Sequence, residues 1–433
     1  MKHWFRDRHF RSLLKNSSYL GMSRGVAAVC SLASLAFAGR GLGVMMLGML
    51  ILIISYAKAA SGIAKFQSWQ LIVRYGGQGL AAGNPEQFKS STGFAAALDI
   101  SSGLVGMLAA VLLLPLIAPW VGIEREYWWL AMAYCALLPT MGAATPSGIL
   151  RTLDRFDLIS WAGTLSPISR AALCGLAFAG GADLAVFVAI WFVTDLIGDL
   201  LMWYLAWREL RRNDLHKGIR PTLRADTLPG AWRFAIQINL TVGVQTVWGP
   251  IARLAVGGLL GPAGAALFRI ASSLADSAQK PADLLAKAFY PEIVRMDPKS
   301  KKPWKLMLRG AALAGALGIV AILILLIGGK PLISLIFGKD FLGAYEPLVV
   351  LMVVPLIAIL SFPLVPMLYA LGRAGDPLKA RIISSVIFFA ALAPLSWRFG
   401  VVGAAAAFVL ATAANAAIMA VQLSGDYRKL RKA

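Results

Sequence analysis

Five cationic side chains interrupt apolar stretches of this 433-residue sequence: Arg24, Lys58, Arg170, Arg253 and Arg269. A charge at the centre of a membrane-spanning helix costs about 2.5–3.5 kcal/mol on insertion scales, so each needs an explanation. Guanidinium groups stay charged and form paired hydrogen bonds to phosphate oxygens, which suits a water-filled cleft that binds a diphosphate. We predict that Arg24, Lys58, Arg253 and Arg269 form this anion site, with Arg170 as a further candidate for substrate binding.

Carboxylates in the same apolar stretches are candidates for ion or proton coupling. Asp195 and Asp199 are one helical turn apart and share a face. Two carboxylates in a low-dielectric site resist simultaneous ionisation, so one of them can hold a proton near neutral pH. We therefore predict Asp195 and Asp199, with Asp99 as a third candidate, as coupling residues for H⁺ or Na⁺. Arg170 is an equally good partner for Asp195 or Asp199, which would make it part of a structural ion pair.

Each remaining polar candidate also has a structural explanation. Arg24 and Lys58 are close enough to helix ends to extend toward lipid headgroups, and Arg253 is next to an expected turn. Gln237 and Asn239 can bond the sugar hydroxyls of a substrate, or they can link neighbouring helices. Both interpretations stay open at the level of the sequence.

The sequence has no arrangement typical of an enzyme. Cys30, Cys135 and Cys174 lie in apolar stretches and the three histidines lie in charged ones, so no metal-ligand cluster is formed. There is no phosphate-binding loop of the GxxxxGK[ST] type and no Ser-His-Asp pattern. We expect no catalytic residues, no metal site and no cofactor.

The elements that position these side chains are expected to be membrane-spanning helices. Apolar residues make up 58% and charged residues 15% of the chain, and the mean hydropathy is +0.71, which excludes an ordinary water-soluble fold. A bilayer-spanning helix needs about 20 apolar residues. Apolar windows predict an all-α polytopic fold with twelve helices near 18–38, 44–64, 92–118, 127–149, 157–180, 183–206, 233–258, 263–288, 307–328, 345–370, 380–397 and 400–423. The junctions at Gly39–Gly43, Gly257–Gly264 and Phe399–Gly403 are expected to be tight turns.

The excess of positive charge is expected to lie on one side of the membrane. Lys and Arg number 42 against 21 Asp and Glu, a net charge of +21. A cytoplasmic N-terminus places most of these cations, including Lys65 and Arg151, in cytoplasmic loops, which is the ordinary result of membrane insertion. Both termini are therefore predicted to be cytoplasmic, and the charge requires no nucleic-acid partner. Eleven further spans favour an uncleaved first helix over a secretory signal.

The chain divides into two similar halves in its pattern of spans. We predict an N-terminal six-helix lobe at 1–206, a basic cytoplasmic linker at 207–232 and a C-terminal six-helix lobe at 233–433. Leu42-Gly43 and Leu260-Gly261 each open the second helix of a half, and they are 218 residues apart (261 − 43). Repeats of this kind in transporters place the substrate in a central cavity between pseudo-symmetric lobes.

Several short motifs are similar to those of the MOP exporter superfamily, in particular to its Wzx-type polysaccharide flippases. They are LAFAGRGLG at 35–43, KFQSWQLIVRYGGQG at 65–79, RLAVGGLLGPAGAALFRIASSLADS at 253–277, PLISLIFGKDFLGAYEPLVVL at 331–351 and FGVVGAAAAFVLATAAN at 399–415. The resemblance implies a flippase of the bacterial inner membrane. Its substrate would be an undecaprenyl-diphosphate-linked oligosaccharide for O-antigen, capsule or exopolysaccharide synthesis, and its partners would include a polysaccharide polymerase and glycosyltransferases. Members often carry an acidic residue close to the position of Arg253, whereas here its neighbours are apolar.

Two other functions remain as alternatives. A MATE-like drug/cation antiporter of the same superfamily also has twelve spans, but its cavity would be acidic or aromatic. A membrane polysaccharide polymerase or glycosyltransferase also has many spans, although such enzymes usually carry a large outer loop that this sequence lacks. A lipid II flippase is less favoured, because that branch typically has two extra helices.

Overall fold

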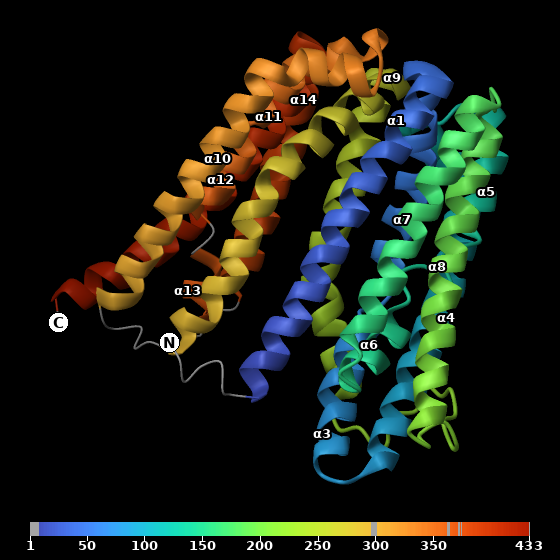
Figure 1. Ribbon diagram of the computed structural model, residues 1–433, viewed down its shortest axis with the longest axis vertical. Coiled ribbons are helices and arrows are strands. Elements are labelled where there is room, and N and C mark those ends of the chain that lie inside the picture. Colours follow the sequence, from blue (N-terminus) through green and yellow to red (C-terminus); the bar gives the residue numbers. More distant parts are fainter. Residues whose placement is uncertain (1–7, 296–300, 362–363, 371–372, 374, 433) are drawn as a thin grey trace. The chain divides into compact units, whose positions relative to one another are not determined.

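The computed structural model describes residues 8–295, 301–361, 364–370, 373 and 375–432, and these residues form an all-helical protein without strands (Figure 1). The predicted all-α fold is therefore confirmed. Contacts divide the chain into two compact units. The first contains the described residues up to Leu42 together with Ile53–Ile251, and the second contains Gly43–Leu52 and the described residues from Ala252 onward. The predicted division into six-helix lobes at 206 and 233 stays a prediction.

The helices of the first part of the chain end at the basic segment. They are α1 (Arg8–Ala64), α2 (Ser68–Leu71), a π-helix (Ile72–Gly76), α3 (Gly77–Ala81), α4 (Pro85–Val121), a 3₁₀ turn (Arg125–Tyr127), α5 (Trp128–Cys135), α6 (Ala144–Thr152), α7 (Phe156–Ala179) and α8 (Leu184–Arg212). A buried apolar cluster that includes Ile72, Phe88, Leu150 and Leu205 joins five of these elements. This packing fixes α6 and α8, two helices on which the candidate site depends.

The second part of the chain contains longer helices. They are α9 (Ala231–Arg295), α10 (Lys301–Ile336), a 3₁₀ segment (Lys339–Ala344), α11 (Tyr345–Leu351), α12 (Val353–Ser361), α13 (Leu364–Ala370) and α14 (Asp376–Lys432). Six of the described helical segments are long and apolar enough to cross a membrane: Gly25–Ala81, Pro85–Val121, Leu184–Arg212, Thr246–Ala278, Lys339–Ser361 and Asp376–Ser424. Several of these segments contain more than one predicted span, so the protein is polytopic.

Single glycines break three of the long helices where tight turns were predicted. Gly43 in α1 has φ 71° and ψ −179°, and Gly261 in α9 has φ 72° and ψ 179°. Gly400 breaks α14 with φ 57° and ψ −135°. Residues with a side chain rarely adopt these angles, whereas glycine has no Cβ to obstruct them. Gly43 and Gly261, the two positions related by the sequence repeat, therefore share one backbone conformation.

Alanine at Gly261 is expected to destabilise the protein by about 1–3 kcal/mol, because this backbone region is essentially restricted to glycine. No neighbouring heavy atom lies within 4 Å of the position of the added Cβ, so the effect would come from the backbone alone. Gly328→Ala is the matched control, since its Cβ also meets open space but its φ is ordinary. Thermal unfolding in detergent measures both variants, and equal melting temperatures would contradict the expectation.

Two of the predicted continuous helices are broken in the structure. The span expected at 127–149 consists of α5 and α6 with an irregular segment at 136–143 between them. Pro139 has no N–H to donate, and this segment is held by short-range bonds such as Leu138 N–H to the Cys135 carbonyl oxygen at 3.0 Å. The span expected at 345–370 is divided at Met352, three residues before Pro355, which likewise lacks a donor.

The segment between α8 and α9 packs against the π-helix and α4 within the first unit. The Tyr75 hydroxyl donates to the Pro229 carbonyl oxygen at 2.9 Å, and the rings of Phe94 and Trp232 meet edge to face at 5.3 Å. Gly93 of α4 lies directly against the Arg220 carbonyl group, where a Cβ would overlap. The basic segment predicted as a linker is thus anchored along part of its length.

Candidate functional site

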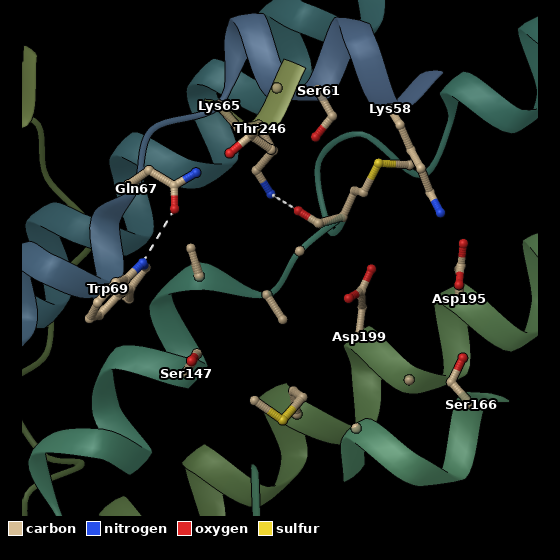
Figure 2. Close-up of a pocket in the computed structure, with 18 of the residues that line it drawn as sticks. Lys58, Ser61, Lys65, Gln67, Trp69, Ser147, Ser166, Asp195, Asp199 and Thr246 are labelled. Atoms are coloured by element: carbon tan, nitrogen blue, oxygen red, sulfur yellow. Dashed lines mark hydrogen bonds between the residues drawn. The ribbon is translucent and has the colours of Figure 1, made fainter. Parts of the chain in front are cut away.

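The first unit contains a cavity of about 620 Å³. Its wall is made by the end of α1, α2, the irregular segment before α6, α6 itself, α7, α8 and the beginning of α9 (Figure 2). The polar side chains that line it are Lys58, Ser61, Lys65, Gln67, Ser147, Arg151, Ser166, Asp195, Asp199 and Thr246, and Trp69 adds a large aromatic surface. An apolar wall with a few convergent polar groups is the usual form of a ligand site.

Three cations reach this cavity. Lys58 is in the last turns of α1 and Lys65 directly follows its last residue; the two are seven residues apart, a spacing that places side chains on one side of a helix. Figure 2 shows the Lys58 side chain extending from α1 toward the part of α8 that carries the two aspartates. Arg151 of α6 lies over the Trp69 ring at 4.5 Å and donates from Nε to the Ser147 hydroxyl at 3.1 Å. These contacts hold the guanidinium of Arg151 in place at the cavity wall.

Two carboxylates reach the cavity from α8. Asp195 forms an ion pair with Arg170 and accepts a hydrogen bond from the Tyr134 hydroxyl at 2.7 Å. Asp199 lies near the backbone N–H of Gly142 and interacts electrostatically with Lys58 and Lys65. Asp195 is paired with Arg170, which does not line the cavity. The three cations of the lining therefore give the cavity an excess of positive charge.

The irregular segment at 136–143 is held at both ends by buried charges. The Lys65 ammonium donates to the carbonyl oxygens of Pro139 at 3.2 Å and Met141 at 2.7 Å. Asp99 accepts from the Thr145 backbone N–H at 2.9 Å, the Thr145 hydroxyl at 2.6 Å and the Ser68 hydroxyl at 2.7 Å. Thus a cation meets carbonyl oxygens of the irregular segment, and an anion meets the N-terminus of α6, as the dipole of that helix favours. Irregular backbone at membrane depth is tolerated where it lines a cavity, which is the case here.

Replacing Asp99 with asparagine is expected to lower the stability of the protein by about 1–3 kcal/mol, because an amide cannot accept all three hydrogen bonds. The Asp99 side chain is 2% exposed, so water cannot replace the lost partner. Asp183→Asn is the matched control: Asp183 caps α8 at the surface by accepting from Val186 N–H, and asparagine caps a helix as well as aspartate does. Thermal melts of the two variants test this, and a control that loses as much stability as Asp99→Asn would contradict the assignment.

The structure brings together some of the predicted site residues. Lys58, Asp195 and Asp199 line the cavity, whereas Asp99 is buried beside it. Arg170 is in the structural ion pair with Asp195 that the sequence offered as one interpretation, and its Nε also donates to the Thr194 hydroxyl at 2.9 Å. The contribution of these residues to binding or coupling stays a prediction.

Gln237 and Asn239 lie on the first part of α9, which belongs to the first unit. The side-chain oxygen Oδ1 of Asn239 is buried without a hydrogen-bond partner among the described residues. Asn239 is seven residues before Thr246, which lines the cavity, so the two share a helix face. Gln237 is exposed. The side chain of Arg24 lies outside the described residues.

Arg253 and Arg269 lie in the second unit, on the two arms of α9. Each is eight residues from Gly261, so both are about 12 Å along their arm from the break. Arg253 interacts electrostatically with Arg269 and Asp276, and Arg269 also interacts with Asp276. The second unit therefore has a cationic pair with one nearby carboxylate.

Sequence reasoning missed most of the cavity wall, including Lys65, Gln67, Trp69 and Arg151. The sequence predicts Lys65 in a cytoplasmic loop and gives it no part in the site, whereas in the structure its exposed fraction is 6% and its ammonium donates to the Met141 carbonyl oxygen. The helical spacing of Lys58 and Lys65 was the available signal. Arg151 carried no such signal, because only the break before α6 brings it to Trp69.

The relationship of this chain to known proteins rests on sequence first. No family model matches it. It is 42% identical over 348 residues to the Inner membrane protein YghQ of Escherichia coli (strain K12), and the match covers 80% of this chain and 98% of that protein. The chain belongs to the YghQ family. No cluster of His, Cys, Asp or Glu that could hold a metal ion occurs in the described part of this YghQ-family protein.

Solved structures place the YghQ fold in a wider group. An inward-facing MATE family multidrug resistance transporter of the MOP superfamily aligns with a TM-score of 0.70 at 14% identity, over 95% of this chain and 96% of that chain. The lipid II flippase MurJ in an inward closed conformation aligns with a TM-score of 0.69 at 15% identity, over 95% and 89% of the two chains. The bent form of the MATE transporter VcmN from Vibrio cholerae gives 0.60 at 14% identity, over 97% of each chain. The resemblance to the MOP superfamily is confirmed at the level of the fold.

Proposed function

We propose that this YghQ-family protein is a flippase that moves a polyprenyl-diphosphate-linked oligosaccharide across the bacterial inner membrane. The inner-membrane description of its E. coli relative and its several apolar helices support a multi-pass inner-membrane location. Both termini are cytoplasmic in this proposal. Its partners are the enzymes that build and polymerise the glycan, namely glycosyltransferases and a polysaccharide polymerase.

The observation that carries the proposal is the positive excess of the cavity in the first unit. Lys58, Lys65 and Arg151 face Asp195 and Asp199, and Asp195 is already paired with Arg170. A diphosphate headgroup complements this excess, since charge-assisted hydrogen bonds to phosphate are among the strongest in proteins. Seryl hydroxyls, Gln67 and the Trp69 ring supply the hydrogen bonds and apolar surface that sugars need.

Alternating access is the mechanism that suits this fold. The headgroup enters the polar cavity while the polyprenyl tail stays in lipid, so the charged part avoids the hydrocarbon core. A change of conformation then exposes the headgroup on the other face of the membrane. Asp199 is the coupling candidate, because it lines the cavity and interacts electrostatically with Lys65 and Lys58.

A MATE-like cation antiporter is the second candidate, and one observation favours it. Asp195 and Asp199 lie in the cavity itself, where carboxylates would attract a cationic drug. The three cations in the same lining oppose this, because a cationic ligand would have to enter against their repulsion. The two functions therefore predict ligands of opposite charge.

A transport assay in proteoliposomes tests the proposal. Purified protein is reconstituted with a fluorescent undecaprenyl-diphosphate-linked glycan, and the fraction of headgroup that a membrane-impermeant enzyme can reach is followed with time. We expect protein-dependent equilibration across the bilayer and none with empty vesicles. Efflux of a cationic dye with no movement of the lipid-linked glycan would instead support the antiporter.

A further inference from the structure

Lys65 lines the cavity and also binds the irregular segment at 136–143. Its ammonium has three N–H donors, of which two bind the carbonyl oxygens of Pro139 and Met141, at 3.2 and 2.7 Å. The residue also lines the cavity and interacts electrostatically with Asp199. An anion in the cavity would therefore compete with the two carbonyl groups for the same ammonium.

The segment that Lys65 contacts is irregular and also has other contacts: Leu138 and Pro139 lie against Gly103 of α4, and the Gly142 backbone N–H lies near Asp199. Residues 136–142 form turns, and Gly142 and Ala143 both have positive φ, 84° and 38°. An alanine in this conformation stores strain that the surrounding contacts must oppose. On its other side the segment is fixed by Asp99 through Thr145, so movement released by Lys65 would be confined to 136–143.

We propose that Lys65 is a latch that reports binding of the headgroup. In the empty cavity its ammonium holds the segment at 136–143 through the carbonyl groups of Pro139 and Met141. When a diphosphate enters, the ammonium turns to the phosphate oxygens, the two carbonyl groups are released, and the segment is free to move. Lys65 is thus a positioning residue for the conformational step, and this role rests on the proposed function because it requires an anionic ligand.

Hydrogen exchange of the backbone amides at 136–143 tests the latch in the full-length protein in detergent. Inorganic pyrophosphate is the probe, and amides at 403–411 in α14 are the internal control for global unfolding. We expect pyrophosphate to speed exchange at 136–143 in the wild type. Lys65→Gln should exchange about tenfold faster or more without pyrophosphate, since the charge-assisted bonds to Pro139 and Met141 are lost, and should gain nothing from the ligand.

Three further variants separate the latch from a merely structural lysine. Lys65→Arg keeps a cationic donor and should exchange slowly until pyrophosphate is added. Lys58→Gln should exchange slowly and lose the response to pyrophosphate, because it weakens binding and leaves the bonds from Lys65 to Pro139 and Met141 in place. Lys217→Gln, at an exposed position in the basic segment, should behave as the wild type.

The outcomes distinguish the latch from the proposed function. Wild-type exchange rates in Lys65→Gln would overturn the latch. The latch would also be overturned by a second pattern: Lys65→Gln exchanges fast, but pyrophosphate binds the wild type without changing the exchange of 136–143. In that case Lys65 stabilises the segment and does not respond to the ligand. If pyrophosphate does not bind the wild type at all, the anionic headgroup of the proposed function is contradicted, and the reporting role falls with it.

Discussion

Replacing Lys58 with glutamate is expected to lower the initial rate of glycan-lipid transport roughly a hundredfold. The cavity has three cations against two carboxylates, so this change turns a positive excess into a negative one. A hundredfold loss corresponds to about 2.7 kcal/mol, which is within the range of one charge-assisted hydrogen bond. Repulsion between the new carboxylate and the diphosphate would add to this loss. The initial rate in proteoliposomes measures the effect.

Two control variants make this prediction specific to charge in the cavity. Lys58→Arg preserves the cation and is expected to keep transport within a few-fold of the wild type. Lys217→Glu introduces the same change of charge at an exposed position in the basic segment and should leave transport unchanged. Equal activity of Lys58→Glu and wild type would remove Lys58 from the binding site.

Removing one partner of the ion pair between α7 and α8 should have the largest effect on stability. Arg170 is 9% exposed and binds Asp195, the Thr194 hydroxyl at 2.9 Å and the Ser166 hydroxyl at 3.3 Å. Asp195→Ala would leave this guanidinium buried without its counter-ion, which destabilises proteins by about 3–5 kcal/mol. Since Asp195 faces the cavity, where water enters, we expect a value of about 3 kcal/mol. Thermal unfolding in detergent measures the loss.

The double variant Arg170→Met/Asp195→Ala is the informative comparison. It removes both charges, so most of the lost stability should return. Glu86→Ala is the surface control and should change stability by less than about 0.5 kcal/mol. A double variant as unstable as Asp195→Ala would show that Arg170 acts through its packing and not through an unpaired charge.

The sequence was sufficient for the all-α fold and the positions of the tight turns. Apolar runs of membrane length have few alternatives to helix, because every backbone group in lipid must be bonded within its own segment. Glycine at positions 43, 261 and 400 is likewise informative, since the backbone conformations found there exclude most other residues. Helix formation and glycine turns depend on residues that are close together in the sequence, so the sequence alone predicts them.

The candidate site was only partly accessible from the sequence. Lys58, Asp195 and Asp199 were recognised as charges within apolar helices, and all three line the cavity. The break at 136–143 could not be derived, because prolines kink some membrane helices and leave others continuous: Pro115 and Pro119 lie within the unbroken α4. Without the break, Lys65 appeared as an ordinary loop cation, and its contacts with Pro139 and Met141 depend on residues more than 70 positions away.

The most direct test of the anionic-headgroup proposal is equilibrium binding to the purified protein in detergent. Farnesyl diphosphate serves as a soluble lipid diphosphate, and tetraphenylphosphonium serves as a lipophilic cation of the kind an antiporter would take. The proposed function predicts saturable binding of farnesyl diphosphate that weakens at least about tenfold in Lys58→Glu and that tetraphenylphosphonium does not displace. Binding of tetraphenylphosphonium with no binding of the diphosphate, or equal affinity of wild type and Lys58→Glu for the diphosphate, would contradict it.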